Sequence, residues 1–240
     1  MLASIRRRCP WLPAALLLGA ALAVIPVASA GVPSPAMAYK AKTAKVKNAD
    51  WAALWWQWAY GVPEIDSPLY EDTGATAAVG QRGPVWFLCG AYNETGIVTR
   101  TITVPEGVYL FFPILATEWD NAGVTVDPLS LDALISLSAD YVAGIDVTSL
   151  TCTVDGVGIT DLAKRRVASS VFGYVTVPDS TPNLAFGALP NEVVHPAVSD
   201  GYWVMLKPLP LGNHTITWSG TVGSNTQGVT YIVKVVAPAN

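Results

Sequence analysis

An aromatic stripe at helical spacing lies early in the chain. Apolar side chains recur at i, i+3, i+4 and i+7, which places them on one face of a helix. The stripe consists of Trp51, Leu54, Trp55 and Trp58. Asp50 can cap the first turn by accepting hydrogen bonds from free backbone N–H groups, and Gly61 ends the helix. Because each aromatic side chain can bury roughly 150–250 Å², we expect this face to pack against the rest of the fold.

The next apolar runs have the lengths and turn boundaries of β-strands. Val85–Leu88 is continuously apolar, as in a strand buried on both faces, whereas Ile97–Val104 alternates apolar residues with threonines, as in a half-exposed strand. Val108–Leu115 is apolar again and follows a Pro-Glu-Gly turn. This short turn predicts that 97–104 and 108–115 pair as a hairpin.

A second helix is predicted after Asp127, which can cap it. Pro128 suits the first helical position, and apolar residues then recur at helical spacing over Leu129–Val142. Strand-like runs return beyond it, first as a hairpin around Asp155-Gly156. Further strands are expected at 171–177, 202–206, 215–219 and 231–236. Roughly eight or more short strands with two helices favour an all-β fold of two packed sheets, a jelly-roll-like or immunoglobulin-like sandwich.

The N-terminal residues have the organisation of a secretory signal peptide. A basic start at Arg6–Arg8 precedes an apolar run over Leu12–Val27, and Ala28-Ser29-Ala30 is a small-x-small cleavage site. The apolar run is shorter than the roughly 20 residues of a membrane-spanning helix, so we expect no transmembrane anchor after cleavage. We therefore expect a secreted, periplasmic or cell-surface protein that is exported by a cleavable leader.

The chain then divides into three parts. Residues 1–30 are the predicted signal peptide, 31–49 a flexible lead-in, and 50–237 a single β-sandwich domain. The lead-in carries a run of lysines, which is typical of a solvated segment. These are Lys40, Lys42, Lys45 and Lys47.

The charge balance excludes one class of partner. The whole chain carries 14 basic and 18 acidic residues, for a net charge of −4. Residues 1–30 hold three of the arginines and no acidic residue, so the net charge without them is −7. A field of that sign repels phosphate backbones, so we expect no nucleic-acid partner.

Two cysteines, Cys89 and Cys152, lie beyond the leader. In an oxidising compartment an isolated pair is a candidate disulfide. Each lies in an apolar run, however, so two free buried thiols are the alternative.

The familiar motifs of metal, cofactor and nucleophile chemistry are missing from the sequence. It contains no H-E-x-x-H, C-x-x-C, G-x-S-x-G or phosphate-binding loop, so we expect no metal site and no cofactor. His214 oriented by Asp200 is a candidate general base. Carboxylates are the remaining candidates for hydrolysis. Glu118 and Asp120 form one pair, and the acidic loop from Glu64 to Asp72 is the other place to look.

Aromatic residues in loops are candidates for ligand binding. Flat apolar faces stack on sugar rings, and polar neighbours bind hydroxyl groups. The longest irregular segments are predicted at 62–83, 116–126 and 178–199. Trp119 is the first candidate, because its acidic and amide neighbours make a buried role less expected than for other tryptophans. Tyr70 and Asn121 are the further candidates.

Several runs are more specific than composition. They are WWQWAYGVPEID (55–66), GQRGPVWFLCG (80–90), TVPEGVYLFFPI (103–114), TVDGVGITDL (153–162) and DGYWVMLKPLPLGNHTITWSG (200–220). With these runs the chain resembles an uncharacterised family of secreted bacterial proteins that has no established activity. The resemblance spans most of the chain after the leader, and it implies one unit rather than tethered domains. It implies no catalytic residues. The run from Leu206 onward also resembles the closing strands of immunoglobulin-like sandwiches.

These observations favour a noncatalytic protein, secreted or associated with the cell envelope. We expect it to bind an extracellular ligand such as a glycan, or to have a structural role among envelope components. A secreted hydrolase that uses the carboxylate pair, in the manner of a glycoside hydrolase, is the alternative.

Overall fold

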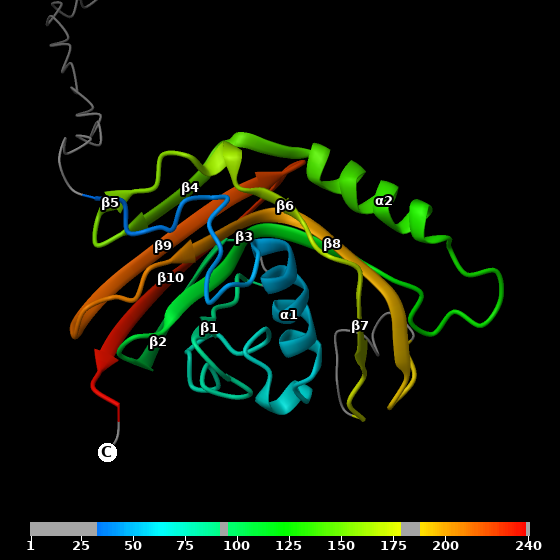
Figure 1. Cartoon of the computed structure of the whole chain (residues 1–240), viewed down its shortest axis with the longest axis horizontal. Helices are drawn as coiled ribbons and strands as arrows, with labels where there is room; N and C mark the ends of the chain where they lie inside the picture. The colour runs from blue at the N-terminus through cyan, green and yellow to red at the C-terminus, as the bar shows by residue number, and fades with distance from the viewer. Residues whose placement is uncertain (1–32, 92–95, 179–187, 239–240) are drawn as a thin grey trace, which may run out of the picture.

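The strands form two β-sheets that face each other (Figure 1). The computed structural model describes residues 33–91, 96–178 and 188–238, so the expected signal peptide lies outside the described residues. The first sheet has the strand order β1-β3-β8-β6, with β7 beside β8. Its strands are β1 (Val85–Phe87), β3 (Tyr109–Trp119), β6 (Arg166–Ala168), β7 (Phe172–Val175) and β8 (Val193–Leu206).

The second sheet has the strand order β2-β10-β9-β4-β5. Its strands are β2 (Gly96–Pro105), β4 (Ile145–Val154), β5 (Val157–Gly158), β9 (Gly212–Val222) and β10 (Asn225–Val236). Each sheet is mixed, because β1 runs parallel to β3 and β2 runs parallel to β10, while the other pairs are antiparallel. The prediction of a mostly β protein with two packed sheets is confirmed.

Two α-helices accompany the sheets, α1 (Asn48–Tyr60) and α2 (Leu131–Ala143), together with short 3₁₀ turns at Glu64–Asp66 and Leu162–Lys164. α1 lies on one side of the first sheet, and α2 lies on the other side over the far ends of β3 and β8 (Figure 1). Among the described residues, neither helix has the length and apolar character needed to cross a membrane.

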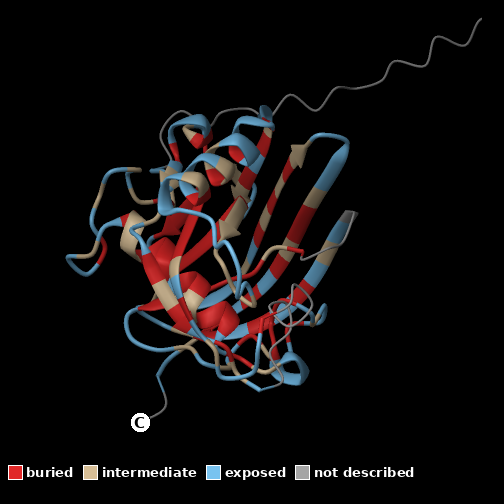
Figure 2. Ribbon diagram, turned by 90° about the vertical axis from the view of Figure 1, so that its right-hand side faces the viewer, coloured by how far each residue is buried: buried red, intermediate tan, exposed pale blue. Residues whose placement is uncertain are grey.

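One hydrophobic core fills the space between the sheets. Phe112 of the first sheet stacks on Trp218 of the second with ring centroids 3.9 Å apart, and Trp218 stacks on Tyr231 at 5.5 Å. Along β10 every second residue from Val229 to Val235 is buried, which is the period of a strand with one face in a core. Buried residues concentrate where the layers meet, and exposed ones at the strand ends (Figure 2).

A second core lies between α1 and the opposite face of the first sheet. Trp55 contacts Trp203 of β8 edge to face, with centroids 5.6 Å apart, and Trp203 stacks on Phe111 of β3 at 5.2 Å. The indole nitrogen of Trp55 donates to the Leu88 carbonyl at 2.9 Å. The expected docking of the aromatic helix on a sheet is therefore confirmed, with its buried N–H satisfied.

The structure corrects the predicted buried face and N-terminal cap of α1. Leu54 is 40% exposed, whereas Trp56 is buried and donates to Ser199 Oγ at 2.7 Å. The buried face is broader than the predicted stripe because α1 contacts β6 and β7 as well as β3 and β8. Asp50 does not cap α1; the helix begins after Lys47, and the Asp50 carboxylate accepts from the Ser170 hydroxyl.

α2 confirms the second predicted helix with a shifted start. Ser130, rather than Asp127, occupies the cap position and accepts from the backbone N–H of Ala133 at 3.2 Å. Asp127 has a backbone φ of 50°, which cannot lead directly into a right-handed helix.

The predicted hairpin between 97–104 and 108–115 is wrong. β2 pairs with β10 in the second sheet, and β3 belongs to the first. The turn at Pro105-Glu106-Gly107 therefore carries the chain from one sheet to the other. The predicted hairpin at Asp155-Gly156 is confirmed as β4 and β5.

A β-bulge in β3 sets which side chains face α1. Pro113 is opposite Trp203 and Leu115 is opposite Tyr202, so Ile114 is an extra residue. Before the bulge Phe111 points to α1, and after it Ala116 does, while Ile114 and Leu115 both enter the core between the sheets. Side chains alternate along a strand, so Glu118 and Asp120 also face α1.

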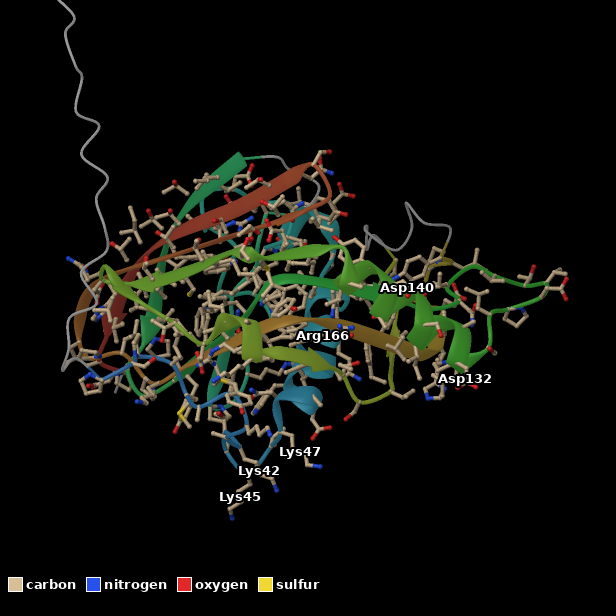
Figure 3. The ribbon with its side chains drawn as sticks, turned by 90° about the horizontal axis from the view of Figure 1, so that it is seen from above. Lys42, Lys45, Lys47, Asp132, Asp140 and Arg166 are labelled. Carbon is tan, nitrogen blue, oxygen red and sulfur yellow. The ribbon has the colours of Figure 1, made fainter. Side chains whose placement is uncertain are left out.

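Part of the predicted flexible lead-in is bound to the first sheet. Ala36 bridges to Leu206, Met37 N donates to the Met205 carbonyl at 2.8 Å, and Lys207 N donates to Pro35 at 2.9 Å. The lysines that follow are solvent-exposed, and Lys42, Lys45 and Lys47 project from the molecule near the start of α1 (Figure 3).

Replacing Gly201 with alanine tests the importance of the bulge. A Cβ at this position would lie 2.4 Å from Ala116 Cβ and 2.6 Å from the Leu115 carbonyl oxygen. We expect Gly201→Ala to lower the free energy of unfolding by about 1–3 kcal/mol, as overpacking does. Urea denaturation measures this loss.

Gly158→Ala is the matched control, because a Cβ there meets nothing within 4 Å. Its unfolding free energy should stay close to that of the wild type. Equal stability of the two variants would contradict the close packing of β3 and β8 at Gly201.

Candidate functional site

A cavity of about 620 Å³ opens along β3 beyond the point where β1 ends. Consecutive residues from Pro113 to Asp120 line it. Alternate residues of a strand point to opposite faces, so an unbroken run of lining residues places the cavity against the strand's edge. Much of the lining is aromatic and comes from four elements. The aromatic residues are Trp55, Trp56 and Tyr60 of α1, Trp119 of β3, Tyr141 of α2 and Tyr174 of β7.

Two carboxyl groups lie in this cavity. Glu118 is the penultimate residue of β3 and Asp120 follows its end, so the two are on the same face of the chain. Their carboxyl groups lie close enough for the charge of Asp120 to raise the pKa of the Glu118 carboxyl. Two ionised carboxylates at close range repel each other, so we expect the pair to hold one shared proton.

Two tyrosines orient the pair. Tyr60 Oη donates to Glu118 Oε2 at 3.1 Å, and the Tyr174 hydroxyl donates to Asp120 Oδ2. The backbone N–H of Ala122 donates to Asp120 Oδ1 at 2.7 Å. Glu118 Oε1 is buried and receives no hydrogen bond from a donor in the described part of the chain. A proton on Glu118 or a donor from outside the described residues is needed to satisfy this oxygen.

The electrostatics favour protonation of Glu118. Burial raises the pKa of the Glu118 carboxyl well above its usual range, the charge of Asp120 raises it further, and the Tyr60 hydrogen bond acts in the opposite direction. Burial and the charges of Glu118 and Asp120 also raise the pKa of Tyr174, so its hydroxyl stays protonated and donates. The site is a pair of carboxyl groups, one of them with a raised pKa, within aromatic walls.

The sequence identified this acidic pair but placed it in the wrong surroundings. Residues 116–119 of the predicted irregular segment 116–126 belong to β3, and Glu118 is half-buried rather than on an open loop. Trp119 is the last residue of β3 and lines the cavity. It is also half-buried, and its indole nitrogen has no acceptor among the described residues.

The other two predicted ligand-binding residues lie outside the cavity lining. Asn121 Oδ1 accepts from the Leu129 backbone N–H at 2.8 Å, and Asn121 Nδ2 donates to the Leu129 carbonyl at 2.9 Å. These two bonds close the loop between β3 and α2. Tyr70 is 36% exposed in the loop after α1. Of the predicted 178–199 segment, the described part enters β8 at Val193 and is not irregular from there on.

Sequence reasoning missed Tyr60 and Tyr174, which hold the two acids. They are 58 and 54 residues away from their partners along the chain. No local pattern links positions this distant. The alternation of side chains along a strand could have indicated only that Glu118 and Asp120 lie on the same face.

The two cysteines are free and buried. Cys89 belongs to the core under α1 and Cys152 to the core between the sheets. Burial raises the pKa of each thiol to about 12, so neither is a reactive nucleophile. The structure therefore corresponds to the second alternative for this pair, two buried thiols.

The candidate base His214 is not paired with Asp200. His214 Nδ1 lies 2.7 Å from Asp155 Oδ2 and Nε2 lies 2.9 Å from the Pro210 carbonyl. Asp200 instead accepts from the Arg166 guanidinium at 2.7 Å. Both contacts of His214 are to acceptors, so they favour its protonated form, and the histidine joins a turn to β9 rather than serving a cavity.

The acidic loop after α1 is tied to the fold by its own acids. The Glu71 carboxylate accepts from the backbone of Thr73 and Gly74, at 2.5 and 2.6 Å, and Asp72 lies 3.6 Å from the buried Arg100. Over residues 33–91, 96–178 and 188–238, no group of three His, Cys, Asp or Glu side chains is arranged to hold a metal ion.

Comparisons of the chain with protein-family models, curated proteins and solved structures find no match. The geometry of the cavity is therefore the basis for a functional proposal.

Replacing Glu118 with glutamine tests its protonation. In the unfolded chain this carboxyl ionises near the ordinary value of about 4.3, whereas the folded protein holds its proton to higher pH. Above that value the native state binds more protons at Glu118, so the contribution of this group to the free energy of unfolding falls as pH rises. We expect Glu118→Gln to remove this fall, so that the variant gains stability relative to the wild type as pH rises above about 4.

Urea denaturation at a series of pH values measures the difference. Glu106→Gln, at an exposed position in the turn between β2 and β3, is the control. Its free energy of unfolding should change with pH in the same way as that of the wild type. A Glu118→Gln profile parallel to the wild type would contradict the protonated state of Glu118.

Proposed function

We propose that this protein is a noncatalytic binding protein that takes a polyhydroxylated ligand, such as a short glycan, into the cavity beside β3. The observation that carries the proposal is the pair of Glu118 and Asp120, held by Tyr60 and Tyr174 between aromatic walls. Export by the predicted leader, and a location outside the cell or at its envelope, belong to the same proposal. So does a jelly-roll-like or immunoglobulin-like type for the sandwich.

The size and lining of the cavity suit such a ligand. Its volume of about 620 Å³ lies within the roughly 300–1,000 Å³ of small-molecule sites. Aromatic faces can stack on sugar rings, and carboxyl oxygens accept from hydroxyl groups. Thr117 and Gln227 add polar groups from β3 and β10.

Trp119 is the side chain proposed to stack on the ligand. It lines the cavity. The other tryptophans in the lining, Trp55 and Trp56, already donate their indole N–H groups to the Leu88 carbonyl and to Ser199 Oγ. The unpartnered indole nitrogen of Trp119 supports this role, because a buried donor without an acceptor costs free energy that a ligand oxygen can recover.

A hydrolase is the second candidate, and one observation favours it. Burial and the neighbouring Asp120 raise the pKa of the Glu118 carboxyl, and a general acid needs a raised pKa. The proximity of the two groups opposes a conventional glycosidase, because Asp120 acts directly on the pKa of Glu118, whereas a glycosidase separates its two carboxyl groups by roughly 5–5.5 Å or 6.5–9.5 Å to leave room for the substrate or a water. Binding is therefore the better-supported function.

Trp119→Ala is expected to weaken glycan binding. Loss of one stacked aromatic should cost about 1–2 kcal/mol of binding free energy, measured by calorimetry with a glycan selected on an array. Trp86→Ala is the matched control, because Trp86 is also half-buried with an unpartnered indole nitrogen but does not line the cavity.

Both variants should lose stability to a similar extent, and only Trp119→Ala should lose affinity. Equal affinity of the two variants for the selected glycan would exclude Trp119 as the stacking residue. If no glycan on the array binds the wild type, the proposed function itself is wrong.

A hydrolase screen separates the two candidates. We expect the wild type to release no product from glycosides or esters. An activity that disappears in Glu118→Gln and in Asp120→Asn while both variants stay folded would replace binding with hydrolysis as the function of the pair.

A further inference from the structure

We propose that the ligand of this cavity carries a protonated amine, as an amino sugar does, and that its binding displaces the proton shared by Glu118 and Asp120. This inference rests on the proposed function and specifies the ligand class. On binding, the O–H bond of the acid breaks, its proton passes to the buffer, and the ammonium N–H groups donate to both carboxylates.

The charged groups that line the cavity are acidic, so a bound cation would neutralise them. Glu118 and Asp120 are acidic, and none of the described lining residues is Lys, Arg or His. The buried arginines of the described chain are committed elsewhere, since Arg165 binds Asp161 and Arg100 binds Asp72 and nearby carbonyls. Two neighbouring carboxyl groups without a cation cannot both ionise at low cost, so we expect the free protein to retain a proton on the pair.

The hydrogen bonds leave a place for donors from outside the chain. Tyr60 donates to Glu118 Oε2. The Tyr174 hydroxyl donates to Asp120 Oδ2, and the Ala122 backbone N–H donates to Asp120 Oδ1. Glu118 Oε1 is buried, and no donor of the described residues reaches it. An ammonium group has three N–H donors and no acceptor. It can therefore take over the role of the shared proton while neutralising both carboxylates.

The walls also favour a cation over a neutral ligand. Indole and phenol rings attract a cation over their faces, most strongly where water is excluded. Trp56, Tyr60 and Tyr174 are buried rings around the acids, and Trp119 extends the aromatic lining. A neutral hydroxylated ligand would gain hydrogen bonds here but would leave the proton of the pair in place. The charge of the ligand is thus the property that the site distinguishes.

A matched pair of ligands tests the inference. Glucosamine trisaccharide and its N-acetylated counterpart share a sugar backbone, but only the first carries ammonium groups. Calorimetry at about pH 6, where amines are protonated, should show at least about tenfold tighter binding of the amine form. Repeating the titration in two buffers of different ionisation enthalpy should show release of about one proton per amine ligand and none for the acetylated form.

Variants of the pair give separate readouts. Glu118→Gln removes the titrating acid, so amine binding should persist while proton release disappears. Glu118→Gln with Asp120→Asn leaves no charge and should abolish the preference for the amine form. Asp140→Asn is the control, because Asp140 is an exposed acid on α2 outside the cavity lining (Figure 3). Near-ultraviolet circular dichroism establishes that each variant is folded.

The outcomes separate this inference from the function on which it rests. Equal affinity for the two trisaccharides, with no proton released, would overturn the amine proposal and leave glycan binding in place. Tighter binding of the acetylated form would do the same. Binding of neither trisaccharide, together with a glycan array without any positive, would overturn both.

Discussion

Packing of the α1 tryptophans against Trp203 and Phe111 is the interaction on which the rest of the structure depends. The first sheet is buried on both faces, by the second sheet on one side and by α1 on the other. Each of these large side chains contributes roughly 1.5–3 kcal/mol by leaving water. The same contact brings Tyr60, at the end of α1, to Glu118. Stability and the candidate site therefore share one interface.

Local periodicity predicted the elements of this fold well and their partners poorly. The helix at Trp51, the strand at Val85 and the hairpin at Asp155 all depend on neighbours in the sequence, and all three are present. The pairing of β2 with β10 joins segments that are far apart in the sequence, and nothing in either strand specifies the other. Trp56 was missed because helical spacing describes one face, whereas α1 is covered on more than one side.

The candidate site shows the same division. Two acids beside a tryptophan drew attention to Glu118 and Asp120, and both line the cavity. Their charge suggested an open loop, yet β3 continues through Trp119 and α1 covers this face. Burial, rather than the identity of the residues, gives the pair its unusual chemistry. The tyrosines that orient the acids come from distant elements, so only the folded chain brings the four groups together.

The extra residue at Ile114 has a consequence for any comparison between related sequences. Ile114 has no partner on β8, and the residues on either side of it keep the faces of their own partners, Trp203 and Tyr202. A relative that lacked this one residue could close the bulge into a regular strand and still present the counterparts of Glu118 and Asp120 to α1. Loss of one residue between Ala116 and Glu118, with the bulge retained, would instead turn both acids to the opposite face. The position of a gap in an alignment, rather than the length of the segment, therefore decides whether a relative retains the pair.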